Sequence, residues 1–338
     1  MIMKLLLAVL VSTIFTLTTF SQGTGLANRA WALTQEKKFG EAVEIYKQVV
    51  KQDPEDGRSF TNLSWCYLEL KQFEEAISAA QRAIELRPAD HVAYNNKGYA
   101  LLMLGQTEPG VEALKVSVDL NGSYEKSRAN LGWGLMKAGR EEEAITQLQA
   151  AVAINPNNAA VHNNLVSIFF RSGKYKEAIA ELEILVSLEP QKASHHSGLG
   201  AAYINSGKHL KAVDAFQQAI ALEPDELQHL RNLAVAQSGA GKREDAIATL
   251  TQVLAKRPKD HEILFSLAIQ NNQLFRYDAA IDYAKQALAV RPDSAQAVMM
   301  IAMSYVAKRD KENAKSYLPK LKELDEDLAK ILEKALEK

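Results

Sequence analysis

The sequence is poor in several features that would indicate a particular class of protein. It contains one cysteine, Cys66, so no disulfide can form within the chain. Neither charge is in excess, because 40 Lys and Arg stand against 41 Asp and Glu. Such a balance leaves no electrostatic footprint for nucleic acid or an anionic membrane surface. The 7% of aromatics, 17 Gly and 9 Pro argue against a β-sandwich and against a low-complexity chain.

Motifs that carry chemistry are also missing. The sequence has no G-x-x-x-x-G-K-[ST] loop, no G-x-S-x-G elbow and no Cys/His zinc spacing. Its seven histidines are scattered, and none is paired with a glutamate in the metalloprotease pattern. Runs of acids such as 141–143 suit the first turn of a helix, where negative charge is favoured by the helix dipole. We therefore expect no catalytic residues, no metal site and no cofactor, and predict that the protein is not an enzyme.

The only long apolar run lies at the N-terminus. It covers 16 residues, from Leu5 to Phe20, and includes five Ser or Thr, whereas a membrane span needs about 20 mostly apolar residues. Lys4 precedes the run, and the small residues Thr19 and Ser21 suit the −3 and −1 positions of a cleavage site before Gln22. We predict that residues 1–21 are a signal peptide and that the protein is exported, to the periplasm, the cell envelope or the medium. The alternative is an uncleaved anchor, which would be the chain's only link to a membrane.

The remainder of the chain repeats every 34 residues. Prolines recur at this interval, with one repeat skipped at Gly122: Pro54, Pro88, Pro156, Pro190, Pro224, Pro258 and Pro292. Alanines recur in the same period and are interrupted only at Gly110: Ala42, Ala76, Ala144, Ala178, Ala212, Ala246, Ala280 and Ala314. Two residue types in one phase over nearly the whole chain indicate an internal repeat architecture.

Each repeat predicts a helical hairpin. When positions are counted from Gly23, positions 4, 7, 8 and 11 fall on one face of a first helix, and positions 20, 24 and 27 on one face of a second. Five repeats have glycine at position 15, which suits the left-handed turn at the end of a helix. Proline at position 32 ends the second helix because it has no N–H and clashes with the preceding turn. A single hairpin cannot bury its apolar face, so neighbouring hairpins must form the core jointly.

This pattern resembles the tetratricopeptide repeat, with its signature W-x2-L-G-x2-Y, A-x3-F and P. The sixth repeat is the most similar, with Leu199, Gly200, Tyr203, Ala212, Phe216 and Pro224. The resemblance implies an all-α, right-handed α-solenoid of about nine helix-turn-helix repeats. These run over 23–56, 57–90, 91–124, 125–158, 159–192, 193–226, 227–260, 261–294 and 295–328. Residues 329–338 are amphipathic and predict a C-terminal capping helix.

The resemblance also implies a concave groove lined by positions 2, 6, 9 and 13 of the first helices. Position 6 carries an asparagine in six repeats: Asn28, Asn62, Asn96, Asn130, Asn164 and Asn232. Position 9 carries all three tryptophans of the protein and one tyrosine: Trp31, Trp65, Tyr99 and Trp133. Amide groups can pair with the N–H and C=O of an extended peptide, and aromatic side chains are enriched at binding hot spots. These ten residues predict a groove that binds a peptide or protein partner.

Several alternatives stay open from the sequence. The asparagines can be structural, and the aromatic side chains can pack against the neighbouring repeat instead of a ligand. The aromatic stripe would also suit a glycan-binding envelope protein, and an assembly component would use the convex face instead. The family's carboxylate clamp is not indicated, because Arg58 and Lys126 are the only basic residues at position 2 and position 9 has no asparagine. Gly110 and Gly122 predict a local soft point within residues 105–125.

Overall fold

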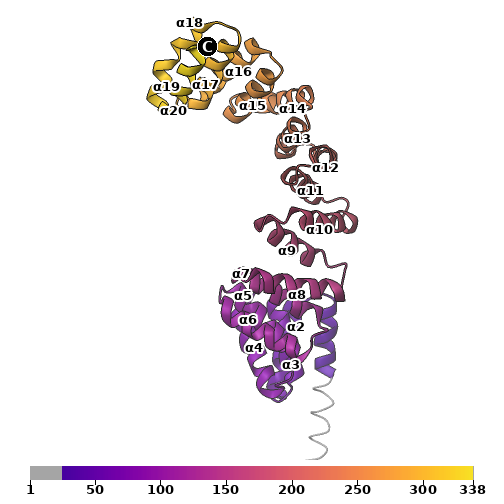
Figure 1. Ribbon diagram of the computed structural model, residues 1–338. Coiled ribbons are helices and arrows are strands. Elements are labelled where there is room, and N and C mark those ends of the chain that lie inside the picture. The colour runs from indigo at the N-terminus through magenta and orange to yellow at the C-terminus, as the bar shows by residue number, and fades with distance from the viewer. Residues whose placement is uncertain (1–24, 338) are drawn as a thin grey trace, which may run out of the picture. The chain divides into compact units, whose positions relative to one another are not determined.

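The computed structural model describes residues 25–337, and all regular structure in that range is helical. The predicted signal peptide lies outside the described residues. The chain divides into two compact units, one that ends at Ile168 and one that begins at Phe169, and each is described here by itself (Figure 1). Within residues 25–337, no helix is both long enough and apolar enough to cross a membrane.

The first unit is a series of helical hairpins. Its helices are those over residues 25–35, α2 (Phe39–Gln52), α3 (Gly57–Glu69), α4 (Phe73–Leu86), α5 (His91–Met103), α6 (Thr107–Leu120), α7 (Glu125–Lys137) and α8 (Glu141–Ile154), and the unit ends within α9 (Ala159–Arg171). The first helices of the hairpins contact one another in chain order, α3 with α5 and α5 with α7. Three second helices also pack on the first helix of the next hairpin: α2 on α3, α4 on α5 and α6 on α7.

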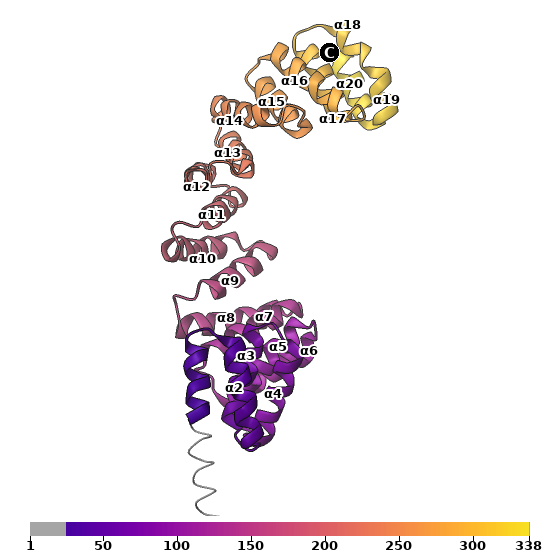
Figure 2. The ribbon, with the colours of Figure 1, turned by 180° about the vertical axis from the view of Figure 1, so that it is seen from behind.

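The second unit continues the same hairpin pattern (Figures 1 and 2). Its helices are α10 (Tyr175–Leu188), α11 (Ala193–Asn205), α12 (His209–Leu222), α13 (Leu227–Gly239), α14 (Arg243–Lys256), α15 (His261–Gln273), α16 (Tyr277–Val290), α17 (Ala295–Ala307), α18 (Lys311–Ser316), α19 (Leu318–Leu324) and α20 (Glu326–Glu337). First helices again contact each other, α11 with α13 and α15 with α17. The predicted all-α array of helical hairpins is thus confirmed within each unit.

The turn inside each hairpin places position 15 in the left-handed region of the backbone. Five turns use glycine, with φ between 67° and 78°, as expected from the lack of a Cβ. The other four place a side chain there, at Lys37, Lys71, Phe275 and Arg309, with φ of 59° to 62°. Phe275 is the unusual member, because it is bulky and 77% exposed.

Small residues at positions 8 and 20 allow the two helices of a hairpin to approach closely. A Cβ atom built on Gly98 would lie 2.6 Å from Leu114 Cγ and 2.9 Å from the carbonyl oxygen of Gly110. A Cβ atom on Gly110 would in turn lie 2.8 Å from Leu102 Cδ2. Gly110 therefore has a packing role between α5 and α6. The predicted softness of residues 105–125 stays a prediction.

The C-terminal end departs from the 34-residue pattern. The period predicts one second helix for the last repeat, but this segment is divided into α18 and α19 at Tyr317, and Pro319 lies in the first turn of α19. The last helix, α20, begins at Glu326 because Asp325 caps it, accepting hydrogen bonds from the backbone N–H of Asp327 and Leu328. It buries Leu332 and packs on α17, so it covers the end of the core.

Candidate functional site

The first unit contains a groove of about 1210 Å³ on the side of its first helices. Its lining comes from five successive repeats and includes eight of the ten residues predicted from the sequence: Trp31, Asn62, Trp65, Asn96, Tyr99, Asn130, Trp133 and Asn164. Asn28 is exposed and does not line the groove. Asn232 lies on α13 in the second unit, where its Oδ1 accepts a hydrogen bond from Gln228 Nε2.

The aromatic residues form two pairs along the groove. The ring centroids of Trp31 and Trp65 are 6.1 Å apart, and those of Tyr99 and Trp133 are 5.9 Å apart. Each pair joins the first helices of adjacent repeats, so these rings pack between repeats and line the groove at the same time. Trp31 remains 47% exposed and is therefore available to a ligand.

Two lysines lie over the tryptophan rings. Lys126 Nζ is 5.9 Å from the ring centroid of Trp65, and Lys137 Nζ is 4.6 Å from that of Trp133. Both distances are within the range of a cation–π interaction. Lys126 belongs to the fourth repeat and Trp65 to the second, so sequence patterns within one repeat could not predict this contact.

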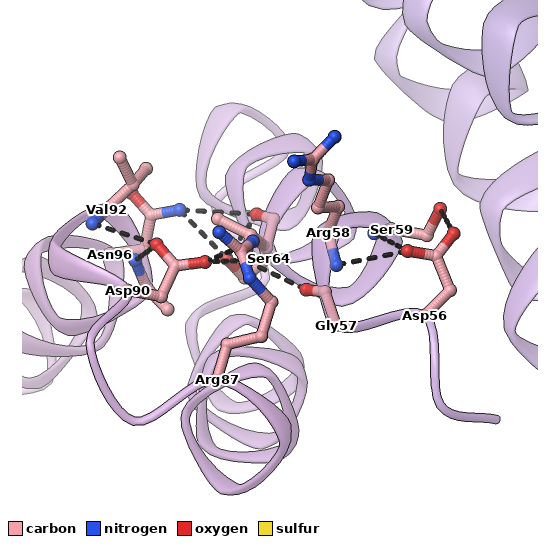
Figure 3. Close-up of polar contacts among 11 residues, drawn as sticks. Asp56, Gly57, Arg58, Ser59, Ser64, Arg87, Asp90, Val92 and Asn96 are labelled. Atoms are coloured by element: carbon pink, nitrogen blue, oxygen red, sulfur yellow. Dashed lines mark hydrogen bonds and ion pairs between the residues drawn. The ribbon is translucent and has the colours of Figure 1, made fainter.

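The asparagines do not share one role. Asn96 is 4% exposed, and its Nδ2 donates to Ser64 Oγ at 2.8 Å, which ties α5 to α3 (Figure 3). Asn130 Nδ2 donates to Asn95 Oδ1 at 2.9 Å and ties α7 to α5 in the same way. This geometry favours the structural interpretation for Asn96. Asn62 and Asn164 are half-buried members of the groove lining.

Asp90 forms the polar floor of the groove and was not singled out from the sequence. It is 6% exposed and caps α5, accepting hydrogen bonds from the backbone N–H of Val92 and Ala93. Its carboxylate also accepts from Thr61 Oγ1 at 2.7 Å and from Arg87 Nη1 at 2.8 Å (Figure 3). Asp90 thus caps α5, the first helix of one repeat, and contacts α3, the first helix of the preceding repeat, through Thr61. The sequence offered one signal for this cluster. Asp90 is the last residue of the second repeat and stands directly before the first helix of the third, and Thr61 is at position 5 of the second repeat.

Six of the seven histidines have hydrogen-bond partners within the fold. His162 and His196, both at position 4, place Nε2 2.9 Å from the carbonyl oxygens of Pro156 and Pro190. A hydrogen bond with His195 at 2.7 Å, with Lys192 nearby, holds the pKa of Glu189 below its usual range. Among the residues that the structure describes, no three His, Cys, Asp or Glu side chains are grouped to hold a metal ion.

Comparison with known proteins supports the repeat assignment. A family model described as tetratricopeptide repeat matches residues 33–97, 135–202 and 203–268, and a second model with the same description matches residues 273–327. No curated protein sequence matches the chain.

Solved structures share the fold at low sequence identity. PilW, a type IV pilus biogenesis factor, is 17% identical, with a TM-score of 0.54 over 62% of this chain and 96% of its own. A tetratricopeptide repeat protein from Parabacteroides merdae is 16% identical, with a TM-score of 0.50 over 73% of this chain and 99% of its own. The C-terminal part of a repeat protein from Cytophaga hutchinsonii is 18% identical, with a TM-score of 0.50 over 78% and 95%. These likenesses show the fold alone.

Proposed function

The chain belongs to the tetratricopeptide repeat family, and we propose that it is a non-catalytic scaffold that binds an extended peptide or protein segment. The observation that carries the proposal is the continuous lining of one groove by first helices of five successive repeats. Its volume of about 1210 Å³ exceeds the roughly 300–1,000 Å³ typical of small-molecule pockets. A long groove with aromatic pairs and amide groups suits a chain segment better than a compact ligand.

The contacts of the tryptophans favour a peptide over a glycan. A sugar ring stacks on an open aromatic face, but Lys126 and Lys137 lie over the faces of Trp65 and Trp133. A peptide can use the same ring edges, the lysine heads and the amides of Asn62 and Asn164. Glycan binding and assembly through the convex face are the two alternatives that the following test distinguishes from peptide binding.

The test uses extended peptides selected from a random display library on the full protein. Their affinity is compared for the wild type, a groove variant with Trp31→Ala and Asn62→Ala, and a control with Val235→Ala. Val235 is exposed and occupies position 9 of the seventh repeat, the position that Trp31 has in the first. We expect the groove variant to lose affinity by tenfold or more, since hot-spot aromatic residues contribute about 2 kcal/mol or more, and the control to bind as the wild type does.

Two results would count against the proposal. Equal peptide affinity for wild type and groove variant would move the binding surface elsewhere, such as the convex face. Quenching of tryptophan fluorescence by cell-wall oligosaccharides, with no response to any selected peptide, would support the glycan alternative.

We also propose that the protein is exported after removal of residues 1–21. The support is the pattern of one basic residue, an apolar run and small residues before Gln22. The intact mass and N-terminal sequence of the protein from the envelope fraction test this proposal. A chain that begins at Gln22 is expected, whereas a chain found only in the cytosol with residues 1–21 attached would contradict it.

A further inference from the structure

We infer that protonation of His91 weakens ligand binding in the groove, an inference that rests on the proposed function. His91 is the first residue of α5 and lines the groove, and its ring Nε2 lies 3.1 Å from Nδ2 of Asn121. Asn121 follows the last residue of α6, and residues 121–124, here called the α6–α7 joint, connect α6 to α7. Among the first eight repeats, this joint is the one that has glycine instead of proline at position 32.

The hydrogen bonds of Asn121 determine which group donates in its contact with the His91 ring. Oδ1 of Asn121 accepts from the backbone N–H of Ser123 at 3.1 Å and from Ser123 Oγ at 2.8 Å. A backbone N–H can only donate, so the amide is oriented with Oδ1 towards Ser123 and Nδ2 towards His91. An amide NH2 can also only donate, so Nε2 of His91 must accept. Only the neutral ring, with its proton on Nδ1, has such an acceptor.

Protonation of His91 would place two donors against each other. Histidine is the side chain that ordinarily changes charge between pH 5 and 8. Both nitrogens of the protonated ring carry a hydrogen, so the bond with Asn121 is lost. Rotation of the Asn121 amide would restore that bond, but it would turn the NH2 group towards the backbone N–H of Ser123 and break the bond formed there. The α6–α7 joint therefore loses a hydrogen bond in either case.

The charged groups around His91 provide no replacement for Asn121. The titratable and charged side chains on the neighbouring elements are Arg58 of α3, Arg87 and Asp90 between α4 and α5, Asp119 of α6, and Tyr124, Glu125, Lys126 and Arg128 around the start of α7. In the part of the chain that the structure describes, none of them forms an ion pair or a hydrogen bond with the His91 ring. Positive charge is also disfavoured at the start of α5 by the helix dipole.

Other contacts would keep the helices in place when His91 is protonated. Ser117 Oγ donates to the backbone carbonyl oxygen of His91 at 2.5 Å, so Ser127 Oγ, which is 2.6 Å from Ser117 Oγ, donates to it. Both serines are fully buried, and neither bond involves the imidazole. The rings of His91 and Tyr124 meet edge to face at 5.1 Å, and an aromatic ring tolerates a neighbouring positive charge. We therefore expect protonation to release the α6–α7 joint without unfolding the hairpins.

The α6–α7 joint leads directly into groove residues of α7. Tyr124, Glu125 and Lys126 line the groove, and Tyr99 and Trp133 form an aromatic pair between α5 and α7. When only a fraction of the molecules has the binding surface correctly placed, the affinity falls in proportion to that fraction. The groove should therefore bind its ligand more weakly when His91 is protonated.

The experiment uses one library-selected peptide that contains no His, Asp or Glu and has both ends blocked, so that the peptide itself does not titrate. Its affinity is measured at about pH 7.5 and about pH 5.5 for the wild type, for His91→Gln and for a control, His196→Gln. Glutamine at position 91 stays neutral and offers a side-chain oxygen to Asn121. His196 lies in the second unit, where its ring contacts the carbonyl oxygen of Pro190, so the control makes the same chemical change outside the groove.

We expect the wild type to bind the peptide about fivefold more weakly at the lower pH, a typical coupling between two sites. The control should show the same decrease, whereas His91→Gln should bind equally at both pH values. A second measurement needs no peptide. The NMR signal of the Asn121 side-chain NH2 should shift between the two pH values in the wild type and stay constant in His91→Gln.

Two results would overturn this inference alone. One is a wild-type affinity that is equal at both pH values, or that decreases equally in His91→Gln, while the groove variant with Trp31→Ala and Asn62→Ala still loses affinity. The other is an Asn121 signal that does not change with pH, because the bond to His91 would then survive. Peptide binding that the groove variant leaves unchanged would overturn the proposed function, and this inference with it.

Discussion

Replacement of Asn96 by alanine tests whether this asparagine stabilises the fold or contacts a ligand. Asn96 Nδ2 donates to Ser64 Oγ at 2.8 Å and to the Thr61 carbonyl oxygen at 3.4 Å, across the contact between α5 and α3. Its Oδ1 accepts from Asn95 Nδ2 at 3.4 Å. With 4% of its surface exposed, Asn96 has little area left for a partner.

The expected cost follows from these contacts. Loss of a buried hydrogen-bonding partner costs about 1–3 kcal/mol, because the groups left behind stay desolvated. The long bonds to Thr61 and Asn95 are weak, so the bond to Ser64 contributes most of the effect. We therefore expect Asn96→Ala to lower the free energy of unfolding of the first unit by about 2 kcal/mol. Asn28→Ala makes the same chemical change at the same repeat position, but Asn28 is exposed, so its effect should stay within about 0.5 kcal/mol.

Urea unfolding followed by tryptophan fluorescence measures this difference. All three tryptophans lie in the first unit, so the signal reports that unit and not the second. Equal urea midpoints for Asn96→Ala and Asn28→Ala would refute the reasoning. A folded Asn96→Ala protein that loses peptide affinity while Asn62→Ala does not would also show that Asn96 contacts the ligand directly.

Three further predictions concern stability. Gly98→Ala should destabilise the first unit by about 1–3 kcal/mol in urea unfolding, because the added Cβ would overlap Leu114. Gly40→Ala, whose added Cβ meets no neighbour, should instead stabilise the unit slightly. The opposite order of stabilities would contradict the packing argument. Phe275→Gly should stabilise the second unit by about 1 kcal/mol through relief of the left-handed backbone, seen as slower hydrogen exchange in residues 261–294; faster exchange would mean that the exposed ring is stabilising. Burial raises the pKa of Tyr46 to about 12, so its stability contribution is complete below pH 10 and is lost as the pH rises towards 12. Tyr46→Phe should therefore reduce the alkaline loss of stability of the first unit, and an unchanged pH profile would assign that loss to other groups.

The sequence was sufficient for the hairpins because their signals act over short distances. Proline at position 32 removes one donor and blocks one turn, and glycine at position 15 adopts a left-handed conformation within a single residue. Each signal recurs every 34 residues, so the helix bounds follow the period closely up to α17. Beyond it, Pro319 divides the last second helix, and no earlier repeat provided a pattern for that break.

The composition of the groove could also be predicted in large part. Positions 6 and 9 lie on the face opposite the packed positions, and eight of the ten residues chosen by this rule line one groove. That they bind a peptide stays a prediction. The rule requires that the repeat contributes to the groove and that the residue itself reaches the lining. Asn232 shares position 6 but lies in the second unit, and Asn28 lies in the terminal repeat, where its side chain is exposed.

The sequence by itself therefore determined the repeat, the hairpins and the faces of their helices, because these depend on residues within about 34 positions of each other. Only the tertiary structure decided which groups in the groove remain available. The contact of Asn96 with Ser64 and the position of Lys126 over Trp65 join residues from different repeats. Such contacts depend on how successive hairpins stack, and a pattern read within one repeat contains no information on that stacking.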